Sequence, residues 1–342
     1  MEKVSETKDI VEYIRSIQEG QWKANLLNVA LELNVFNVLL ENQKLSSTEL
    51  ANKCGVKFHR PSDFFNALVA ARFLDRDQND LYSLSEISQK VLNPNNYEHY
   101  MVPYFIWTTS RAFTLGIDRF KQLLQSEEIE EKVQLGSEYY TDVPPPDFFS
   151  DAMHGVSMLA SVSIPQLEFW KDFKTFADIG GSKGTVSVQI CKAHEHIFGT
   201  VCELPSVQEK CEQYIKAQNL NDRLQFQELD FFRQEFPEVD VLIFGHILHN
   251  WPIETSQMIL QKARKALNKN GAIIVYQAFL DNEKKNNFKS AMMELNMALM
   301  GKGQEFTEQE ILDLITKNGF SDARIHNDKS FKAAIAFKRE TD

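Results

Sequence analysis

The second half of the chain alternates short apolar runs with amphipathic stretches. The apolar runs predict strands at 176–179, 199–202, 224–227, 239–244, 272–276, 321–326 and 331–337. The stretches between them carry apolar residues at helical spacing and predict helices over 184–193, 207–218, 254–267 and 307–318. Strands that alternate with helices build a parallel sheet with helices on both faces. We therefore predict an α/β domain over residues 171–342 with a doubly wound, Rossmann-like sheet.

The first hundred residues show the helical period without this alternation. Apolar residues recur at helical spacing over 10–40, and Ser46 or Ser47 is a candidate N-cap for the next helix. A further helix is predicted over 61–73, and the turn residues of 75–85 predict a β-hairpin. We therefore predict that residues 1–100 form a helical, winged-helix domain that serves packing and dimerisation.

An aromatic-rich segment, residues 101–170, joins the two predicted domains. The run Val-Pro-Pro-Pro at 143–146 breaks any helix there. In our interpretation most of the aromatic rings belong to a core, and a minority line a pocket for a flat ligand. We predict a helical connector that contributes to this pocket.

Charge and cysteine content exclude several classes of protein. The chain has 342 residues and a formal net charge of -11, and its first hundred residues hold 11 Lys and Arg against 14 Asp and Glu. An acidic chain without a basic cluster argues against nucleic-acid binding. The four cysteines form no C-x-x-C pair, and the N-terminus lacks the apolar segment of a signal peptide. We expect a cytoplasmic protein that binds neither nucleic acid nor a membrane.

A glycine-rich motif lies between the first predicted strand of the α/β domain and the helix that follows. It reads Asp-Ile-Gly-Gly-Ser-Lys-Gly over 178–184. Glycines let the backbone turn sharply and approach a ligand closely. Their G-G-x-x-G spacing differs from the G-x-G-x-x-G of dinucleotide folds, which disfavours an NAD-dependent dehydrogenase.

Carboxylates stand at the ends of the next two predicted strands. Glu203 follows the glycines by about twenty residues, where a carboxylate accepts hydrogen bonds from ribose hydroxyls. Asp230 ends the third strand, so it is placed to accept from an adenine amino group while Phe231 or Phe232 packs against the base. These features predict a cofactor that contains a nucleoside.

Six motifs carry a family resemblance. DIGGSKG, CELP, LDFF, GHILHNW, NGAIIVYQ and GQEFTEQE occur in this order between residues 178 and 310. Together they resemble the small-molecule O-methyltransferases typified by the caffeic acid and acetylserotonin (hydroxyindole) enzymes, and the resemblance covers nearly the whole chain. It implies S-adenosylmethionine as methyl donor, a seven-stranded class I methyltransferase sheet and a homodimer joined by the N-terminal helices. The predicted cofactor-binding residues are Asp178, Gly180, Gly181, Gly184, Glu203, Leu204, Asp230, Phe231, His246, Asn250 and Trp251.

The family's general base falls on His249, and an acidic partner of that base falls on Glu305. Methyl transfer to oxygen is an in-line displacement, which requires the donor methyl and the acceptor oxygen to be aligned. A phenol has a pKa of about 10, so a neutral imidazole that takes its proton speeds the reaction. A carboxylate on the other ring nitrogen fixes the tautomer and stabilises the imidazolium. The resemblance therefore implies methylation of a phenolic or hydroxylated (hetero)aromatic small molecule in specialised metabolite biosynthesis.

Three residues depart from the family pattern. Asn250 replaces the Asp that usually follows the base, Glu203 replaces a shorter Asp, and Gln277 replaces a second acidic partner of the base. Gln277 is able to accept from an imidazole N–H but cannot offset a positive charge. We therefore predict an acceptor hydroxyl on an electron-poor or multi-ring aromatic. The same replacements leave open a related enzyme with changed chemistry, either N-methylation or a non-methylating rearrangement.

Aromatic, methionine and polar residues on either side of these motifs are candidates for the acceptor pocket. They are Tyr104, Trp107, Phe149, Met153, His154, Met293, Asn296, Met297 and Met300. Such residues at helical spacing also fill ordinary cores, so the sequence does not separate the two roles. His246 and His249 lack a third ligand at suitable spacing, and we predict no metal. A winged-helix transcriptional regulator is the alternative of a different class, and the acidic N-terminal residues disfavour it.

Overall fold

The computed structural model describes residues 6–96, 99–110, 117–125, 149–285, 287–300, 303–328 and 331–339. The chain divides into two compact units, Met1–Val102 and Pro103–Asp342. The predicted Pro-rich break at 143–146 lies outside the described residues, and so does the side chain of Met300. The separate connector over 101–170 stays a prediction, because its described residues from 103 onward belong to the second unit.

The N-terminal unit combines helices with a small antiparallel sheet. Its helices are α1 (Glu6–Glu32), α2 (Val35–Asn42), α3 (Ser47–Cys54), α4 (Pro61–Ala70) and α5 (Glu86–Val91). Its strands are β1 (Leu45–Ser46), β2 (Leu74–Arg76) and β3 (Leu81–Leu84), in the order β1-β3-β2. Ser46 is the N-cap of α3, because its side chain accepts the Glu49 N–H while the Glu49 side chain accepts its own N–H. The hairpin of β2 and β3 agrees with the prediction, whereas the two-residue strand β1 has no signal in the sequence pattern.

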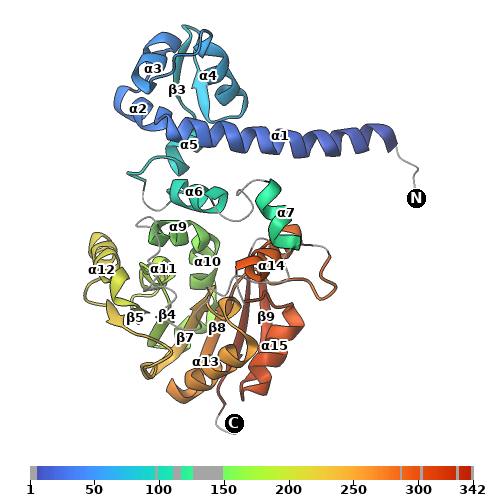
Figure 1. Cartoon of the computed structure of the whole chain (residues 1–342). Helices are drawn as coiled ribbons and strands as arrows, with labels where there is room; N and C mark the ends of the chain where they lie inside the picture. The colour runs from blue at the N-terminus through green and yellow to red at the C-terminus, as the bar shows by residue number, and fades with distance from the viewer. Residues whose placement is uncertain are drawn as a thin grey trace. The chain divides into compact units, whose positions relative to one another are not determined.

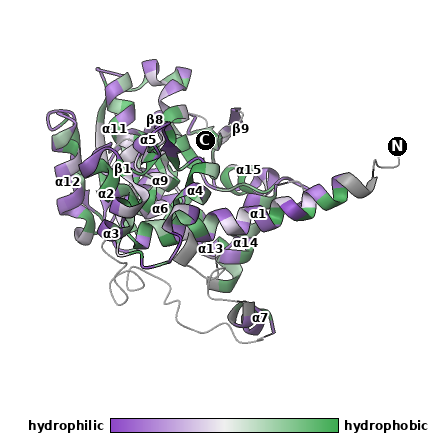
Figure 2. Ribbon diagram, turned by 90° about the horizontal axis from the view of Figure 1, so that it is seen from above, coloured by the Kyte–Doolittle hydropathy of each residue, from purple (hydrophilic) through white to green (hydrophobic). Residues whose placement is uncertain are grey.

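Helix α1 leaves most of its length uncovered within the N-terminal unit. The side chains of residues 9–23 are all exposed, whereas Leu27 and Ala30 are buried. Figure 2 shows hydrophobic residues distributed along this helix. The large apolar side chains in the exposed stretch are Ile10, Val11, Tyr13, Ile14, Ile17 and Trp22. The helical period of 10–40 is divided between α1 and α2, because Asn34 adopts a φ of 58° between them.

A seven-stranded sheet forms the centre of the second unit. Its strands are β4 (Thr175–Ile179), β5 (Phe198–Glu203), β6 (Leu224–Glu228), β7 (Val239–Gly245), β8 (Leu267–Tyr276), β9 (Ser321–Asp328) and β10 (Phe331–Phe337). Their spatial order is β6-β5-β4-β7-β8-β10-β9. Strand β10 is antiparallel to both of its neighbours, and the remaining pairs are parallel. The predicted doubly wound sheet is confirmed, with β8 starting at Leu267 rather than at residue 272.

Helices cover both faces of this sheet, as Figure 1 shows. The helices from residue 102 onward are α6 (Val102–Ser110), α7 (Ile117–Gln125), α9 (Phe149–Val156), α10 (Met158–Ser163), α11 (Thr185–Ala193), α12 (Gln208–Ala217), α13 (Ile253–Ala266), α14 (Phe288–Met300) and α15 (Glu308–Lys317), and α10–α13 and α15 are those that pack on the sheet faces. Residues of α10, α11 and α12 share one hydrophobic core with the sheet, and residues of α13 and α15 share the other. In β7, Val241 and Ile243 pack into the first core, whereas Leu242 and Phe244 pack into the second. Burial on both faces explains why the central strands read as continuous apolar runs.

The direction of strand order reverses between β4 and β7. Strands β5 and β6 continue on one side of β4, and β7 and β8 lie on the other side. In open α/β sheets, ligands bind outside the carboxyl ends of the strands at such a reversal. The predicted cofactor and catalytic residues follow β4, β5, β6, β7 and β8, so this topology collects most of them at one edge of the sheet.

Candidate active site

The turn after β7 carries the predicted base. Gly245 ends the strand without a side chain, and a Cβ there would lie 2.2 Å from the Tyr276 ring. His246 follows with a φ of 55°, in the left-handed region that residues other than glycine rarely adopt. The short 3-10 helix η5 (Leu248–Asn250) comes next and contains His249, which is 4% exposed.

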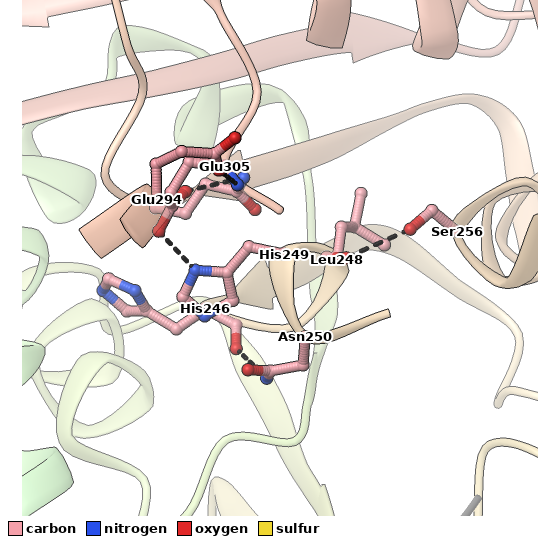
Figure 3. A network of polar contacts seen from close by, with 8 residues as sticks. His246, Leu248, His249, Asn250, Ser256, Glu294 and Glu305 are labelled. Carbon is pink, nitrogen blue, oxygen red and sulfur yellow. Dashed lines mark hydrogen bonds and ion pairs between the residues drawn. The ribbon is translucent and has the colours of Figure 1, made fainter. Parts of the chain in front are cut away.

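His249 forms a buried pair with Glu305. Its Nδ1–H donates to Glu305 Oε1 over 2.6 Å, as Figure 3 shows, and Glu305 is 1% exposed. Because a carboxylate accepts but does not donate, this contact places the ring hydrogen on Nδ1 and leaves Nε2 as an acceptor. The main chain supports the pair, since Gln304 N–H donates to the His249 carbonyl over 2.9 Å. The structure thus brings together the predicted base and its predicted acidic partner.

Glu305 has two further partners. Gln277, directly after β8, donates from Nε2 to Glu305 Oε2 over 3.2 Å. Glu294 of α14 accepts the backbone N–H of Glu305 on Oε2 over 2.5 Å. The hydrogen bond of Gln277 therefore goes to the carboxylate, whereas the sequence predicts that Gln277 accepts from the imidazole. Its own Oε1 is buried, and no group in the described ranges hydrogen-bonds to it.

His246 lies beside the base rather than acting with it. The two imidazole rings have centroids 5.4 Å apart, and the His246 ring stands edge-on to Tyr276. Burial, reinforced by the neighbouring His249, lowers the pKa of His246 to about 3, so this imidazole is neutral near pH 7. Asn250 donates from Nδ2 to the His246 carbonyl over 2.8 Å. The amide of Asn250 is thus used to hold the turn.

The glycine loop after β4 makes a tight turn beside the turn after β7. Gly180 and Gly184 have φ values of 69° and 85°, in the left-handed region that favours glycine. A Cβ on Gly180 would lie 2.3 Å from Ile247 Cδ1, so the loop and the turn after β7 approach closely. Ser182 Oγ is buried and finds no hydrogen-bond partner in the part of the chain that the structure describes. Buried hydroxyls usually have a partner, so this one is available to a ligand.

Two carboxylates flank this loop, of which Asp178 is buried and Glu203 is half-buried. Ser187 Oγ donates to Asp178 Oδ2 over 2.7 Å, and a Cβ on Gly181 would lie 2.7 Å from Asp178 Cγ. Burial raises the pKa of Asp178 to about 7, and the charge of Glu203 adds to the effect of burial. Burial also raises the pKa of Glu203, whose Oε1 accepts the Leu204 N–H over 2.7 Å. Both acids therefore lie in a region of low polarity at the carboxyl ends of β4 and β5.

An aromatic cluster follows β6. Asp230 Oδ1 accepts the Phe232 N–H over 3.0 Å, which turns the chain toward Trp251. The rings of Phe232 and Trp251 lie edge-to-face with centroids 4.8 Å apart, and the Phe231 ring lies tilted against Phe232 with centroids 4.7 Å apart. Trp251 is 2% exposed, and its Nε1–H has no acceptor among the described residues. A buried donor without a partner at a ring-lined surface suits a planar ligand that carries acceptor atoms.

The predicted acceptor residues fall on three helices. Tyr104 and Trp107 lie on α6, Phe149, Met153 and His154 on α9, and Met293, Asn296 and Met297 on α14. The Trp107 and Phe149 rings are in edge-to-face contact at 4.8 Å, so α6 and α9 meet at this pair. Burial raises the pKa of Tyr104. His154 is buried and its Nδ1 lies 2.8 Å from Thr185 Oγ1, so this residue ties α9 to the start of α11.

Residues on α9 and α14 that are not aromatic complete this set. Met153, Met293 and Met297 are half-buried. Asn296 is 6% exposed, and its Oδ1 has no hydrogen-bond donor within the described ranges. Buried amide oxygens are normally paired, so Asn296 is a polar group that a ligand is able to satisfy.

An ion pair beside the glycine loop, buried at its lysine, has no counterpart in the predicted site. Lys183 is 3% exposed, and its Nζ donates to Asp151 Oδ1 of α9 over 2.7 Å. Burial lowers the pKa of Lys183, and Asp151 opposes that effect. Lys183 belongs to the glycine motif, but Asp151 lies 32 residues earlier and in no motif. The sequence therefore carries no signal for the pair, and the same holds for Glu294.

The described residues contain no group of three or more His, Cys, Asp or Glu side chains that could hold a metal ion. The absence of a metal from the enzyme stays a prediction. Within the same ranges, no helix is both long enough and apolar enough to cross a membrane.

Two family models match the chain. Residues 132–321 match the O-methyltransferase domain, and residues 16–94 match the O-methyltransferase dimerisation domain. The chain therefore belongs to the O-methyltransferase family, and it is an S-adenosylmethionine-dependent O-methyltransferase with a dimerisation domain. The family resemblance, the methyl donor and the class of enzyme are confirmed, which excludes the dehydrogenase and the transcriptional regulator.

Individual relatives match over most of the chain. The tetracenomycin polyketide synthesis 8-O-methyl transferase TcmO of Streptomyces glaucescens is 28% identical, over 86% of this chain and 87% of its own length. The N,N-dimethyltransferase OxyT of Streptomyces rimosus is 24% identical, over 76% of each chain. Among solved structures, human N-acetylserotonin methyltransferase in complex with S-adenosylmethionine has a TM-score of 0.81 at 20% identity, covering 99% of this chain and all of that chain. This structural likeness shows the shared fold.

Proposed function

We propose that the enzyme methylates a hydroxyl group of a phenolic or hydroxylated (hetero)aromatic natural product, with His249 as the general base. The observation that carries this proposal is the buried contact of 2.6 Å between His249 Nδ1 and Glu305 Oε1. His249 follows β7, next to the reversal of strand order where α/β sheets bind their ligands, and Glu305 reaches it from the segment before α15. A paired imidazole at that edge is suited to taking a proton from a bound acceptor.

The residues after β4, β5 and β6 suit the methyl donor. When bound, S-adenosylmethionine supplies an electrophilic methyl group on a sulfonium sulfur. The backbone of residues 180–184 would hold its methionyl part, Glu203 its ribose hydroxyls and Asp230 its adenine amino group. The buried Ser182 hydroxyl and Trp251 N–H, which lack partners among the described residues, support this assignment.

His249 would take the acceptor's proton on Nε2. Its Nδ1 already carries the hydrogen that is donated to Glu305, so only Nε2 is free to accept. Glu305 stabilises the imidazolium that forms, and both side chains are almost fully buried, which strengthens their electrostatic attraction. General base catalysis of this kind accelerates a reaction by about 10²–10⁴-fold.

The position of Gln277 favours an acidic acceptor. Gln277 donates to Glu305 Oε2, and a hydrogen bond to a carboxylate reduces the negative charge that it offers to a second partner. His249 is then a weaker base than it would be beside two carboxylates. We infer an acceptor hydroxyl on an electron-poor or multi-ring aromatic, and the polyketide enzyme TcmO among the relatives supports this class. A higher kcat/KM on a simple phenol than on an acidic hydroxyanthraquinone would contradict it.

Helices α6, α9 and α14 supply the candidate walls of the acceptor pocket. The half-buried Met153, Met293 and Met297 would contact a flat apolar ring system, because thioether side chains adapt to ligands of varied shape. The buried Asn296 Oδ1, which lacks a donor within the described ranges, would accept from a polar group of the acceptor.

The enzyme works as a homodimer in our proposal. The match of residues 16–94 to a dimerisation domain and the exposed apolar side chains of α1 support it, because several large apolar side chains exposed along one helix are typical of an interaction surface. All four cysteines are buried free thiols, which supports a reducing compartment and therefore the cytoplasm.

Methyl transfer to nitrogen is a second candidate reaction. The relative OxyT is named an N,N-dimethyltransferase, and it matches three quarters of this chain. An amine accepts a methyl group in its neutral form, and His249 would then take the proton of an ammonium rather than that of a hydroxyl. The pair of His249 and Glu305 would therefore serve either acceptor. The site of methylation in the product, oxygen or nitrogen, distinguishes the two reactions.

Incubation with S-adenosylmethionine and a panel of naphthols, hydroxyanthraquinones, flavonoids and their amino analogues tests the proposal. We expect release of S-adenosylhomocysteine with an O-methyl product, whereas an N-methyl product would favour the second candidate. His249→Ala should lower kcat by about 10²–10⁴-fold. Calorimetry should show unchanged affinity of this variant for S-adenosylhomocysteine. Full turnover by His249→Ala would contradict the role of the base.

A further inference from the structure

The backbone that presents Glu305 is not part of a helix or a strand. Residues 303–306 form an irregular segment between α14 and α15. This segment lies against η5, where a Cβ on Gly303 would come within 2.4 Å of the His249 carbonyl oxygen. The hydrogen bonds of a helix or strand therefore do not fix the position of the Glu305 backbone. The orientation of the Glu305 side chain depends on individual contacts of this segment.

Glu294 supplies one of these contacts from outside the segment. Its Oε2 accepts the Glu305 N–H over 2.5 Å, and Figure 3 shows the Glu294 side chain beside Glu305. The carboxylate of Glu305 is held separately, by His249 and Gln277. Glu305 is thus fixed at two places. Its main chain is held by Glu294, and its side chain is held by His249 and by the amide of Gln277.

A carboxylate is a strong hydrogen-bond acceptor for the Glu305 N–H. A hydrogen bond to an ionised acceptor is shorter and about twice as strong as one between neutral groups. Glu305 is 1% exposed, so water does not readily replace Glu294 as the partner of its N–H. Loss of the contact would leave a buried donor unpaired. The main-chain hydrogen bonds of Gln304 and Phe306 would still hold the segment on either side of Glu305, so the expected change is a local shift at Glu305.

Helix α14 also carries the candidate acceptor residues. Met297 stands three residues after Glu294 and therefore on a neighbouring position of the same helix surface. Met293 and Asn296 flank Glu294 along the chain, and all of these side chains are buried or half-buried. A rigid helix thus carries both a wall of the proposed pocket and the group that holds the backbone of Glu305.

We propose that Glu294 is a positioning residue that couples acceptor binding on α14 to the orientation of Glu305, and through Glu305 to His249. This inference rests on the proposed function of the pair of His249 and Glu305. An acceptor that seats well against α14 keeps Glu294 where it holds the Glu305 N–H. A poorly seated acceptor moves the helix and misaligns the carboxylate that supports the base. Glu294 then affects kcat for acceptors that need a base, without contacting the acceptor.

The test compares variants on acceptors of graded acidity. It uses one aromatic skeleton that the wild-type enzyme methylates, unsubstituted and with nitro groups that lower the hydroxyl pKa. Glu294→Ala should lower kcat on the least acidic member by about tenfold or more, because small misplacements of catalytic groups cost that much. The loss should shrink as the acceptor becomes more acidic, because an ionised phenol does not need His249. A purely structural role would lower kcat equally across the series.

Conservative and control variants sharpen the comparison. Glu294→Gln keeps an oxygen at the same reach and should retain kcat within about threefold of wild type. Glu195→Ala removes an exposed carboxylate before β5 and should change nothing. Calorimetry with S-adenosylhomocysteine checks that each variant is folded. If Glu294→Ala does not bind it, Glu294→Asp, which keeps the charge and is one methylene too short, takes its place in the series.

Several outcomes would overturn the inference. They are a loss that is uniform across the series, a change confined to KM, or a Glu294→Gln enzyme as slow as Glu294→Ala. The proposed function fails separately, since His249→Ala is measured on the same acceptors. If His249→Ala keeps full turnover, the base is wrong. If His249→Ala is slow while Glu294→Ala matches wild type, the base stands and the coupling is wrong.

Discussion

Lys183 Nζ lies 2.7 Å from Asp151 Oδ1, and this ion pair joins the glycine loop to helix α9. The same region has a second connection, because His154 of α9 lies 2.8 Å from Thr185 at the start of α11. Lys183 is 3% exposed, whereas the Asp151 side chain is 31% exposed. The loop that we assign to the methyl donor is thus tied at two places to a helix that we assign to the acceptor pocket.

Removal of the Asp151 charge should destabilise the fold. Asp151→Asn leaves the buried Lys183 ammonium without its carboxylate, and because the Asp151 side chain is 31% exposed we expect a loss of about 1–3 kcal/mol in the free energy of unfolding. Urea denaturation measures this quantity. Asp222→Asn, at an exposed position, is the matched control and should stay within about 0.5 kcal/mol of wild type. Equal stability of the two variants would show that the ion pair contributes nothing.

Asp178 should make the stability of the protein depend on pH. Burial raises its pKa from 3.8 to about 7, so between these values the folded state holds a proton that the unfolded state has released. The contribution of this group is therefore complete below about pH 4 and is lost as the pH rises to about 7. Asp178→Asn keeps an oxygen for the Ser187 hydroxyl but has no proton to lose. Denaturation of both proteins at several pH values between 4 and 7 measures the difference, and parallel curves would contradict the prediction.

The glycine at 180 should matter to binding as well as to folding. Gly180→Ala places a Cβ at a φ of 69° and 2.3 Å from Ile247 Cδ1, so the backbone is strained and Ile247 must move. Gly55→Ala meets the same φ of 69° with nothing within 4 Å. Both variants should lose about 1–2 kcal/mol of unfolding free energy, from the cost of the left-handed conformation.

The two glycine variants should differ in their affinity for S-adenosylhomocysteine, measured by calorimetry. Ile247 lies between His246 and Leu248, so its displacement reaches the turn that carries His249. We expect weaker binding for Gly180→Ala and unchanged binding for Gly55→Ala. Equal affinities would mean that the close approach of the loop to this turn has no role in binding.

Charges on α1 should separate the dimer. Tyr13 and Ile17 are 67% and 55% exposed within the N-terminal unit and lie four residues apart, on one side of the helix. Tyr13→Asp with Ile17→Asp places two charges on that side, and burying an unpaired charge at an interface is unfavourable. Sedimentation should then show a monomer. Phe198→Asp, a change at an exposed apolar residue of the second unit, should leave the dimer intact, and a dimer that survives both changes would exclude this side of α1 from the interface.

Periodicity predicts the elements of the sheet where each strand is buried on both faces. The predicted strand 239–244 corresponds to β7, Val239–Gly245, because residues 241–244 alternate between the two cores and include no polar side chain. The apolar pattern does not predict a strand where the residues are exposed and polar. The first part of β8, residues 267–271, is largely exposed and polar. Its Leu267 pairs with Val239 of β7, and a register shift separates this pair from the regular pairing that starts at Ala272. The division of 10–40 into two helices likewise depends on Asn34, which no apolar period marks.

The sequence by itself determined which residues we assign to the methyl donor and to the base, because the motifs around residues 178–184 and 245–251 place them next to recognisable strand ends. Only the tertiary structure decided what Glu305 contacts. Its partners His249, Gln277 and Glu294 lie 56, 28 and 11 residues away along the chain. Hydrogen bonds over such separations depend on how the order of strands brings their loops together. A local pattern of side chains does not specify the order of the strands, so it does not predict which groups contact Glu305.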